Sequence, residues 1–396
     1  MTKQDIYICS ALRTPIGSFQ GGFAQTSAVV LGATVIREIL QRTPQAASKT
    51  GECVMGCVLQ GGLGQAPARQ AWLGGGGDES VPCTTINRVC GSGMQAIISV
   101  ARAMLNNEYS VAVAGGMENM TLAPFALPRA RQGYQLGVPN AGMIDLLIHD
   151  GLWDPYENQH MGTICEQLLH ARGLTRERQD DFAISSYERA IKAQRDGLFS
   201  HEMVTVAAKG KKGNTTLAAD EGPLRFHPDK FRRLRPAFDK KTGTITAGNA
   251  SAINDGAAAL LLANADGCDQ LGLNPLARIV DWSAVAAAPT QFPLSPTLAI
   301  QALLAKTGMA ITDVDCMEIN EAFSAVPLLA MDALSVDGAI VNPLGGAVAL
   351  GHPIGASGAR IVATLLSSLK HLGGKRGLAT LCIGGGEGVA LMVELV

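Results

Sequence analysis

The sequence predicts an α/β fold made of two similar halves, and three observations lead to this prediction. Short apolar segments typical of buried strands alternate with segments of helical period. A glycine-flanked helix followed by a strand that ends in glycines occurs twice, once after Cys90 and once after His352. The 396 residues are 47% hydrophobic and 17% charged, which suits a large core shared by two domains.

The elements follow from local patterns. Five short apolar segments read as strands: Ile6–Ser10, Val111–Ala114, Ala277–Val280, Cys316–Ile319 and Leu378–Ile383. The first repeated helix begins at Gly91 or Ser92, because one face of a 3.6-residue period is apolar as far as Leu105. The second opens at Gly355 and continues through Leu369. Each repeat therefore carries one helix followed by one predicted strand.

The sequence between the two halves is more polar. It contains a predicted helix over Arg176–Asp196 and loops rich in proline, glycine and lysine. We interpret it as an insertion in the first half. The predicted domains are an N-terminal half of residues 1–119 and 249–270, an inserted loop domain of residues 120–248, and a C-terminal half of residues 271–396.

Composition excludes several classes of protein. The formal net charge of −2 does not provide the basic surface that a nucleic-acid partner requires. The longest apolar segment, Gly256–Ala265, is too short to span a membrane, and we expect no membrane partner. A strand predicted so near Met1 leads us to expect a cytoplasmic location. The nine cysteines lack the spacing of a disulfide framework or a zinc site, so we expect reduced thiols and no metal.

Cys90 is the candidate nucleophile. Most cysteines are small buried hydrophobic residues, and that interpretation applies to each of the nine at first. Cys90, however, directly precedes a glycine-flanked helix start, where unpaired N–H groups and the helix dipole favour a thiolate. His352, in a tight Gly/Pro-bounded loop at the equivalent start of the second helix, is the candidate base. If a pseudo-twofold axis relates the halves, these two side chains face each other.

Two further sites have alternative interpretations. Cys382 precedes the run Gly384-Gly385-Gly386, whose amides suit a developing oxyanion, but a tight turn with a buried cysteine fits equally well. Asn320 follows a predicted strand and is either a helix cap or a group that holds a water molecule. Dinucleotide-binding, P-loop, zinc-protease and serine-hydrolase motifs are all missing from the sequence. Of the reaction classes considered, the one left is attack of a cysteine thiol on an acyl group.

At this point the sequence resembles the thiolases, and within them the acetyl-CoA acetyltransferases. The resemblance runs almost from end to end. Its ordered motifs are Arg13-Thr14-Pro15-Ile16-Gly17, Asn87-Arg88-Val89-Cys90-Gly91-Ser92-Gly93, Gly115-Gly116-Met117-Glu118-Asn119-Met120, His160-Met161-Gly162, Asn249-Ala250-Ser251, Asn320-Glu321-Ala322-Phe323, Gly351-His352-Pro353 and Cys382-Ile383-Gly384-Gly385-Gly386. The resemblance implies a thiolase-like fold of two α/β halves, each with a mixed five-stranded sheet, and an inserted loop domain that covers coenzyme A.

The implied reaction joins two acetyl-CoA molecules into acetoacetyl-CoA and CoA, or runs in reverse as thiolysis, through an acyl-enzyme. Carried over by motif, Cys90 is the acylated nucleophile, His352 its base, and Cys382 the group that removes a proton from the second acetyl-CoA. The resemblance implies one oxyanion hole from His352 and a water held by Asn320. It implies a second from the amides of Cys90 and Gly384.

The resemblance also implies contacts with the substrate and between subunits. The substrates are coenzyme A thioesters, with no tightly bound cofactor. The pantetheine-binding residues carried over are Leu152, His160, Met161, Phe238, Ala247, Ser251, Ala322 and Phe323. The basic residues Lys230, Arg232, Arg233 and Arg235 either contact the phosphates of CoA or form a solvated face. A homo-oligomer, dimer or tetramer, is expected, with residues Phe125–Gly142 a candidate for tetramer contacts.

One departure from the family pattern concerns chain length. Phe292 stands roughly where short-chain relatives carry a methionine near the acyl pocket. A bulky ring there either blocks a longer acyl chain or repacks. The alternatives to an acetoacetyl-CoA thiolase are therefore a degradative 3-ketoacyl-CoA thiolase that prefers longer chains and, more remotely, a non-catalytic CoA-binding protein.

Overall fold

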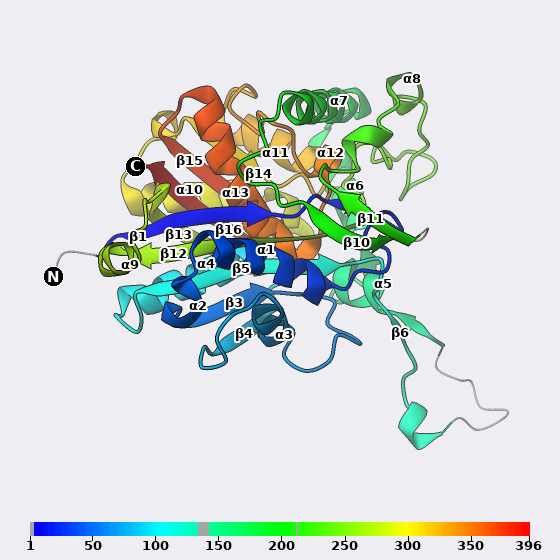
Figure 1. The fold of residues 1–396 in the computed structure, drawn as a ribbon. Helices are drawn as coiled ribbons and strands as arrows, with labels where there is room; N and C mark the ends of the chain where they lie inside the picture. Colours follow the sequence, from blue (N-terminus) through cyan, green and yellow to red (C-terminus); the bar gives the residue numbers. More distant parts are fainter. Residues whose placement is uncertain (1–3, 134–141, 211–212) are drawn as a thin grey trace.

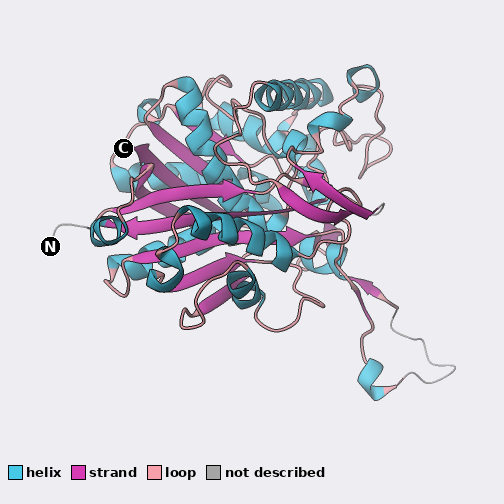
Figure 2. Cartoon of the chain, in the orientation of Figure 1, coloured by secondary structure: helices cyan, strands magenta, loops and turns pink. Residues whose placement is uncertain are grey.

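The computed structural model describes residues 4–133, 142–210 and 213–396. Two α/β halves stand side by side, and their strands form one continuous mixed sheet through short pairing between β1 (Ile6–Arg13) and β13 (Ala277–Ala286) (Figures 1 and 2). Helices α4 (Ser92–Leu105) and α13 (Ile354–Leu372) pack against each other between the halves. The largest apolar cluster is formed by these two helices and the sheet faces that enclose them.

The first half contains five strands in the order β4-β3-β5-β12-β1. Strand β3 pairs in parallel with β4 and β5, whereas β12 is antiparallel to β5 and β1. The additional strands are β3 (Glu52–Gly56), β4 (Cys83–Ile86), β5 (Val111–Asn119) and β12 (Asn254–Asn264), with β2 (Gly17–Ser18) paired to β12. The outer face is covered by α1 (Ala28–Arg42) and α3 (Pro67–Gly74); α2 (Ala46–Lys49) and α9 (Ala265–Leu271) are short.

The second half repeats this order as β14-β15-β16-β13. Its strands are β14 (Cys316–Ile319), β15 (Arg376–Ile383) and β16 (Glu387–Leu395), and its outer helices are α10 (Ser295–Thr307) and α11 (Ala325–Leu334). At the position equivalent to β4 the structure has a single parallel bridge between Met317 and Val341. The mixed five-stranded sheet expected in each half is therefore complete in the first half, whereas the fifth strand of the second half is reduced to this bridge. The shared order of strands and helices confirms the duplication.

The predicted strand that ended before Gly115 was too short. Strand β5 continues through Gly115 and Gly116 to Asn119 and is buried throughout. A Cβ atom on Gly115 would lie 2.2 Å from the carbonyl oxygen of Ala258, and one on Gly116 would lie 2.1 Å from that of Gly355. These glycines allow β12 and the start of α13 to approach β5 closely, and they do not terminate the strand.

The residues between β5 and β12 form helices and hairpins over one end of the two halves. Their helices are α5 (Leu146–Gly151), α6 (Met161–Arg172), α7 (Arg176–Arg195) and α8 (Pro228–Phe231), and their hairpins are β6 (Phe125–Ala126) with β7 (Ile144–Asp145), β8 (Trp153–Asp154) with β9 (Gln159–His160), and β10 (Val206–Gly210) with β11 (Gly213–Leu217). The predicted helix over Arg176–Asp196 is confirmed as α7, capped by Thr175. Figure 1 shows β6 in an arm that projects away from the body.

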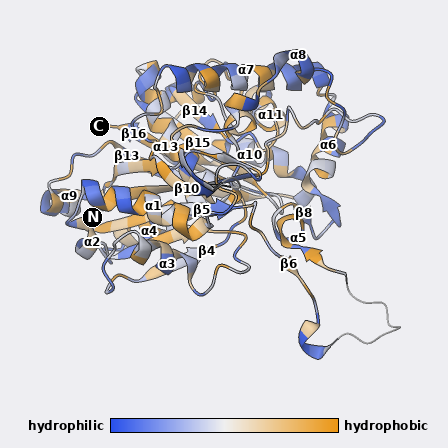
Figure 3. Cartoon of the chain, turned by 45° about the vertical axis from the view of Figure 1, so that its right-hand side comes forward, coloured by the Kyte–Doolittle hydropathy of each residue, from blue (hydrophilic) through white to orange (hydrophobic). Residues whose placement is uncertain are grey.

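Hydropathy follows this architecture. Figure 3 shows largely hydrophobic strands in the body and a hydrophilic α8 at the periphery. Arg13 is an exception to this pattern, because its charged side chain is fully buried at the end of β1. It bonds to Glu202 and Asp220 of the polar segment, the residues 120–248 between β5 and β12. A buried arginine needs such partners, so these bonds attach the polar segment to the first half. Within the described residues, no helix has the length and apolar character needed to cross a bilayer.

Candidate active site

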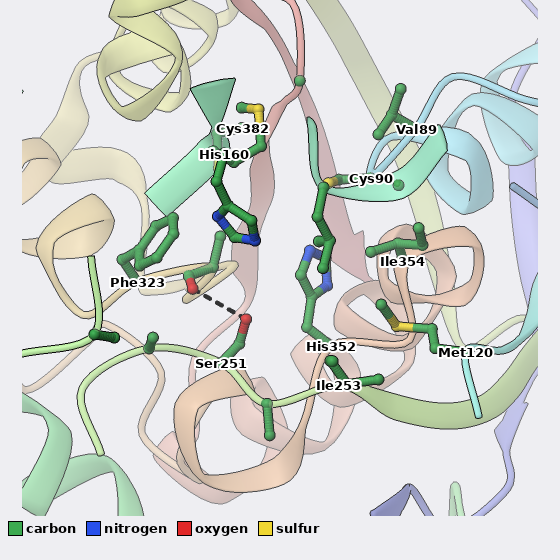
Figure 4. A pocket seen from close by; sticks show the side chains of 18 of the residues that line it. Val89, Cys90, Met120, His160, Ser251, Ile253, Phe323, His352, Ile354 and Cys382 are labelled. Atoms are coloured by element: carbon green, nitrogen blue, oxygen red, sulfur yellow. Dashed lines mark hydrogen bonds between the residues drawn. The ribbon is translucent and has the colours of Figure 1, made fainter. Parts of the chain in front are cut away.

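A cavity of about 380 Å³ opens where the two halves meet the polar segment, and it is lined mainly by apolar side chains. It brings together residues from distant parts of the sequence (Figure 4). Four of the five predicted catalytic residues line it: Cys90, His352, Cys382 and Gly384. All eight predicted pantetheine-binding residues line it as well: Leu152, His160, Met161, Phe238, Ala247, Ser251, Ala322 and Phe323.

Cys90 lies at the start of α4, as the sequence predicted, and its backbone is held in an unusual turn. The preceding residue, Val89, has φ of 45°, a left-handed conformation that strains a β-branched side chain. Burial raises the pKa of the Cys90 thiol to about 11, although N–H groups of Gly384 and of Cys90 itself oppose the increase. In the absence of substrate the thiol is therefore protonated at neutral pH.

His352 lies at the equivalent start of α13, with its ring beside Cys90 (Figure 4). Its Nδ1 lies 2.6 Å from Ser357 Oγ, which donates its own proton to the carbonyl oxygen of Pro353. Ser357 must therefore accept a hydrogen bond from Nδ1–H, and this leaves Nε2 unprotonated. Burial, and to a smaller extent the charge of Arg360, lowers the pKa of His352 to about 3. The imidazole is thus a neutral proton acceptor.

Asn320 follows β14 and does not cap a helix, since α11 begins at Ala325. Its Nδ2 lies 3.4 Å from His352 Nε2, a long contact. Its Oδ1 is buried and has no hydrogen-bond partner among the described residues. An unsatisfied buried oxygen next to a cavity is a position at which a water molecule would be bound.

Cys382 and Gly384 occupy the end of β15 and the turn into β16. The segment is a tight turn with a buried cysteine, and it also lines the cavity, so the oxyanion-binding role of its amides stays a prediction. Burial, followed by the proximity of Cys90, raises the pKa of Cys382. A Cβ on Gly384 would project toward Val89 and Met161, which also line the cavity. A side chain there would therefore reduce the space beside Cys90.

Two polar side chains in the wider part of the cavity have defined hydrogen-bonding capacity. Ser251 Oγ donates to the carbonyl oxygen of Ala322 at 3.0 Å, so its lone pairs remain free to accept an amide N–H. His160 Nδ1 accepts from the N–H of Gly162 at 3.0 Å, which places its proton on Nε2. Its ring stacks on Phe238 at 4.9 Å. The site thus offers one acceptor and one donor among apolar walls.

The sequence did not reveal the groups that hold His352. Ser357 looked like part of a small-residue helix start, and its spacing from His352 has no recognisable signature. Asn254 of β12 accepts the backbone N–H of His352 at 3.1 Å, and Glu118 of β5 accepts that of Gly355 at 2.9 Å. Both contacts cross from the first half to the second, so a sequence pattern within one half could not indicate them.

Other predicted contact residues lie outside the cavity. The side chains of Lys230, Arg232, Arg233 and Arg235 are exposed, and Arg232 is paired with Asp181 at 2.5 Å. The candidate tetramer segment Phe125–Gly142 lies partly in the arm, and its residues 134–141 are outside the described part of the chain. Among the residues that the structure describes, no three His, Cys, Asp or Glu side chains are grouped to ligate a metal.

Comparisons with known proteins agree with this geometry. The family profile for the thiolase N-terminal domain matches residues 6–266, and that for the thiolase C-terminal domain matches residues 273–395. The chain is 45% identical to an acetyl-CoA acetyltransferase of Yarrowia lipolytica, over 98% of this chain and 96% of that protein. It is 44% identical to one of Saccharomyces cerevisiae over the full length of both.

A solved structure shows the same fold. The crystal structure of the Acat5 thiolase from Ascaris suum in complex with coenzyme A matches with a TM-score of 0.93 and 41% identity, covering 99% of this chain and 100% of that one. Both domains of the family, nearly the whole sequence and the fold agree. The chain therefore belongs to the thiolase family.

Proposed function

We propose that the protein is an acetyl-CoA C-acetyltransferase, which condenses two acetyl-CoA molecules to acetoacetyl-CoA and CoA and catalyses the reverse thiolysis. One observation carries the proposal. Two thiols and a neutral imidazole with an unprotonated Nε2 share one apolar cavity, and the backbone N–H of Gly384 lowers the pKa of the Cys90 thiol. This arrangement suits acyl transfer through a thioester enzyme intermediate.

In the first half-reaction Cys90 Sγ attacks the thioester carbon of acetyl-CoA and its proton passes to His352 Nε2. The high pKa of Cys90 and the low pKa of His352 oppose charge separation before the substrate binds. The tetrahedral oxyanion would accept hydrogen bonds from the N–H groups of Cys90 and Gly384. When the C–S bond to CoA breaks, a proton from Cys382 to the departing thiolate yields CoA and leaves Cys382 ionised.

In the second half-reaction the Cys382 thiolate removes an α-proton from a second acetyl-CoA. The resulting enolate oxygen would be held by His352 and by a water bound at Asn320, whose Oδ1 has no partner among the described residues. The enolate carbon attacks the acetyl group, the bond to Cys90 breaks, and Cys90 regains its proton from His352. Both thiols and the imidazole return to their initial protonation states, so they titrate as one coupled set.

The coenzyme would enter past the polar segment. Ser251 can accept a pantetheine amide proton and His160 can donate from Nε2, while Phe238 and the remaining predicted contacts wall the chain. We assign residues 120–248 to the loop domain that covers CoA, residues 1–119 and 249–270 to the first half, and residues 271–396 to the second. The exposed basic residues near α8 are candidates for contacts with the phosphates.

Phe292 supports a preference for short acyl chains. It lines the cavity, is only 2% exposed, and lies with its ring 6.4 Å from that of Phe323. A buried ring packed against a second ring resists displacement, so it would limit the length of the acyl group.

A homo-oligomer in the cytoplasm completes the proposal. The arm exposes Phe125, Leu127 and Met143, at 60%, 54% and 69% of their surfaces. Apolar side chains so exposed on a projecting hairpin suit contact with another subunit. Light scattering after size-exclusion chromatography should give a dimer or tetramer, and replacing Phe125, Leu127 and Met143 by serine should lower the mass if the arm joins subunits.

The decisive experiment measures CoA-dependent loss of acetoacetyl-CoA by the purified protein beside the loss of 3-ketohexanoyl-CoA. We expect a clear preference for acetoacetyl-CoA. A preference for the longer substrate would assign the protein to the degradative 3-ketoacyl-CoA thiolases. Activity on neither substrate, with all thiols reduced, would instead support a non-catalytic CoA-binding role.

A further inference from the structure

We propose that Arg88 and Glu387 are positioning residues, whose ion pair across the two halves fixes the spacing between the backbone N–H groups of Cys90 and Gly384. The inference rests on the proposed function, because these two N–H groups form the oxyanion hole for acyl transfer. Since one N–H comes from each half of the molecule, their separation depends on how the two loops meet.

The ion pair joins the loops directly. Arg88 Nε and Nη2 both donate to Glu387 Oε2, at 2.7 and 2.5 Å, although 299 positions separate the residues. Arg88 lies two residues before Cys90, and Glu387 lies three residues after Gly384. Two converging hydrogen bonds from a planar guanidinium restrict direction as well as distance.

Each partner is also anchored in its own half. Arg88 Nη1 donates to Gln95 Oε1 of α4 at 2.6 Å. The carbonyl oxygen of Glu387 accepts from Ser295 Oγ, at the start of α10, at 2.6 Å. The ion pair therefore connects the loop before α4 with the turn between β15 and β16. Each of these segments is also held by a helix of its own half, so a change in the ion pair would alter how the two segments meet.

Only a few residues separate the ion pair from the two N–H groups, so the intervening backbone can transmit the restraint. Val89, between Arg88 and Cys90, is held at φ of 45°, and Gly385 and Gly386, between Gly384 and Glu387, have φ of 86° and 87°. The loops also touch through apolar atoms. A Cβ on Gly91 would lie 2.4 Å from Ile383 Cδ1. Apolar contact is not directional, whereas the ion pair is.

The pair has an electrostatic consequence as well. Arg88 neutralises the carboxylate of Glu387. Loss of Arg88 would leave that negative charge uncompensated, whereas loss of the Glu387 charge would not. The side chains of the two residues are 25% and 38% exposed, so the pair contributes little to global stability. Its effect should therefore appear in the chemical step.

The test measures kcat, KM and Tm for thiolysis of acetoacetyl-CoA by Arg88→Met, Glu387→Gln and the double variant. In Arg88→Met we expect kcat to fall about 10- to 100-fold, as for a misplaced oxyanion donor, with KM and Tm nearly unchanged. Glu387→Gln should lose less, and the double variant should be no worse than Arg88→Met. Arg88→Lys should recover part of the rate. Arg178→Met, which breaks the more exposed Arg178–Asp332 pair, is the matched control and should retain wild-type kcat.

Wild-type kcat in both single variants, or losses that simply multiply in the double variant, would overturn the inference while leaving the proposed function intact. An inactive wild-type protein would instead contradict the proposed function. In that case the rate of alkylation of Cys90 by iodoacetamide, measured as a function of pH, still tests whether the Arg88–Glu387 ion pair positions the N–H of Gly384. Because the N–H of Gly384 lowers the Cys90 pKa, Arg88→Met should shift the alkylation midpoint upward. An unchanged midpoint would overturn the inference.

Discussion

The starts of α4 and α13 occupy equivalent positions in the two halves but present different chemistry. The α4 start carries Cys90 after a strained Val89, and the N-cap position of the helix is Gly91, which provides no side-chain hydrogen bond. The α13 start carries His352, which is 5% exposed and fixed by Ser357. Because the two helices pack on each other, the duplication brings the proposed nucleophile and the proposed base together, although no single motif contains both.

The comparison also explains why the cavity is asymmetric. On the first-half side the Cys90 thiol lines the cavity, whereas the second half supplies the imidazole of His352, a second thiol and the Gly384 turn. The repeated backbone places one helix start from each half at the cavity. The side chains at these two positions differ, so each half contributes different proposed functional groups. The predictions below test that division.

The largest expected effect is the loss of the first-half nucleophile. Cys90→Ser should lower kcat by at least about 10³-fold, because a hydroxyl is far harder to ionise than a thiol, while CoA affinity stays nearly unchanged. Steady-state thiolysis and calorimetric CoA binding measure the two quantities. Cys9→Ala, which removes a partly buried thiol away from the cavity, is the control. Full turnover by Cys90→Ser would contradict the assignment of the nucleophile.

The second thiol should separate the two half-reactions. Cys382→Ser should reduce condensation about 10²-fold or more while retaining measurable acetylation of Cys90, since general-base catalysis contributes about this factor. Acetylation is followed by mass spectrometry after a single exposure to acetyl-CoA. Equal loss in both half-reactions would mean that Cys382 does not act chiefly in proton removal from the second substrate.

The next largest effect should come from loss of the hydrogen bond between Ser357 and His352 Nδ1. Ser357→Ala removes the acceptor for Nδ1–H, so the ring can rotate or change tautomer, and kcat should fall about 10²-fold with little change in KM. The pH profile of kcat should change along with the rate. Ser324→Ala is the matched control, because the hydroxyl of Ser324 is equally buried and has no partner among the described residues. If Ser357→Ala keeps the wild-type kcat and pH profile, the hydrogen bond from His352 Nδ1 to Ser357 is not required for activity.

The same imidazole predicts a pH-dependent stability. Burial lowers the pKa of His352 from 6.5 to about 3, so between these values the unfolded chain binds a proton that the folded protein does not. This contribution therefore decreases stability as pH falls, by about 2 kcal/mol between pH 7 and pH 5.

Denaturant unfolding of wild type and His352→Gln at both pH values measures this term. Glu118 acts in the opposite direction, because burial raises its pKa to about 7, but it is present in both proteins and cancels in the difference. The stability of wild type relative to the variant should be lower at pH 5 than at pH 7. A difference that does not change with pH would mean that His352 is not held neutral.

The smallest expected effect concerns the acyl pocket. Phe292→Ala should shift kcat/KM about tenfold in favour of 3-ketohexanoyl-CoA over acetoacetyl-CoA, because the removed ring makes room for further methylenes. It should also cost about 3 kcal/mol of stability, as for other buried aromatic truncations. An unchanged substrate ratio in a folded Phe292→Ala protein would show that chain length is limited elsewhere.

Local patterns predicted much of the fold because its signals are short in range. The apolar face from Met94 to Leu105 and the glycine-flanked starts predicted the start of each helix within one residue, although α13 continues three residues beyond the predicted Leu369. Strand ends were predicted less well. Strand β13 extends to Ala286, well beyond the predicted Val280, because pairing with β16 continues to Glu387. A partner more than a hundred residues away leaves no mark on the sequence of the strand itself.

The sequence by itself predicted which groups would gather at the site. Cys90, His352, Cys382 and Asn320 were assigned by motif, and all four lie in or against one cavity. Only the tertiary structure decided their chemical state. The tautomer of His352 depends on Ser357 and Pro353, and the environment of Cys90 depends on a backbone N–H from the other half. A residue type fixes which proton can move. Burial and hydrogen bonds formed between distant segments fix where that proton rests, and these exist only once the two halves have met.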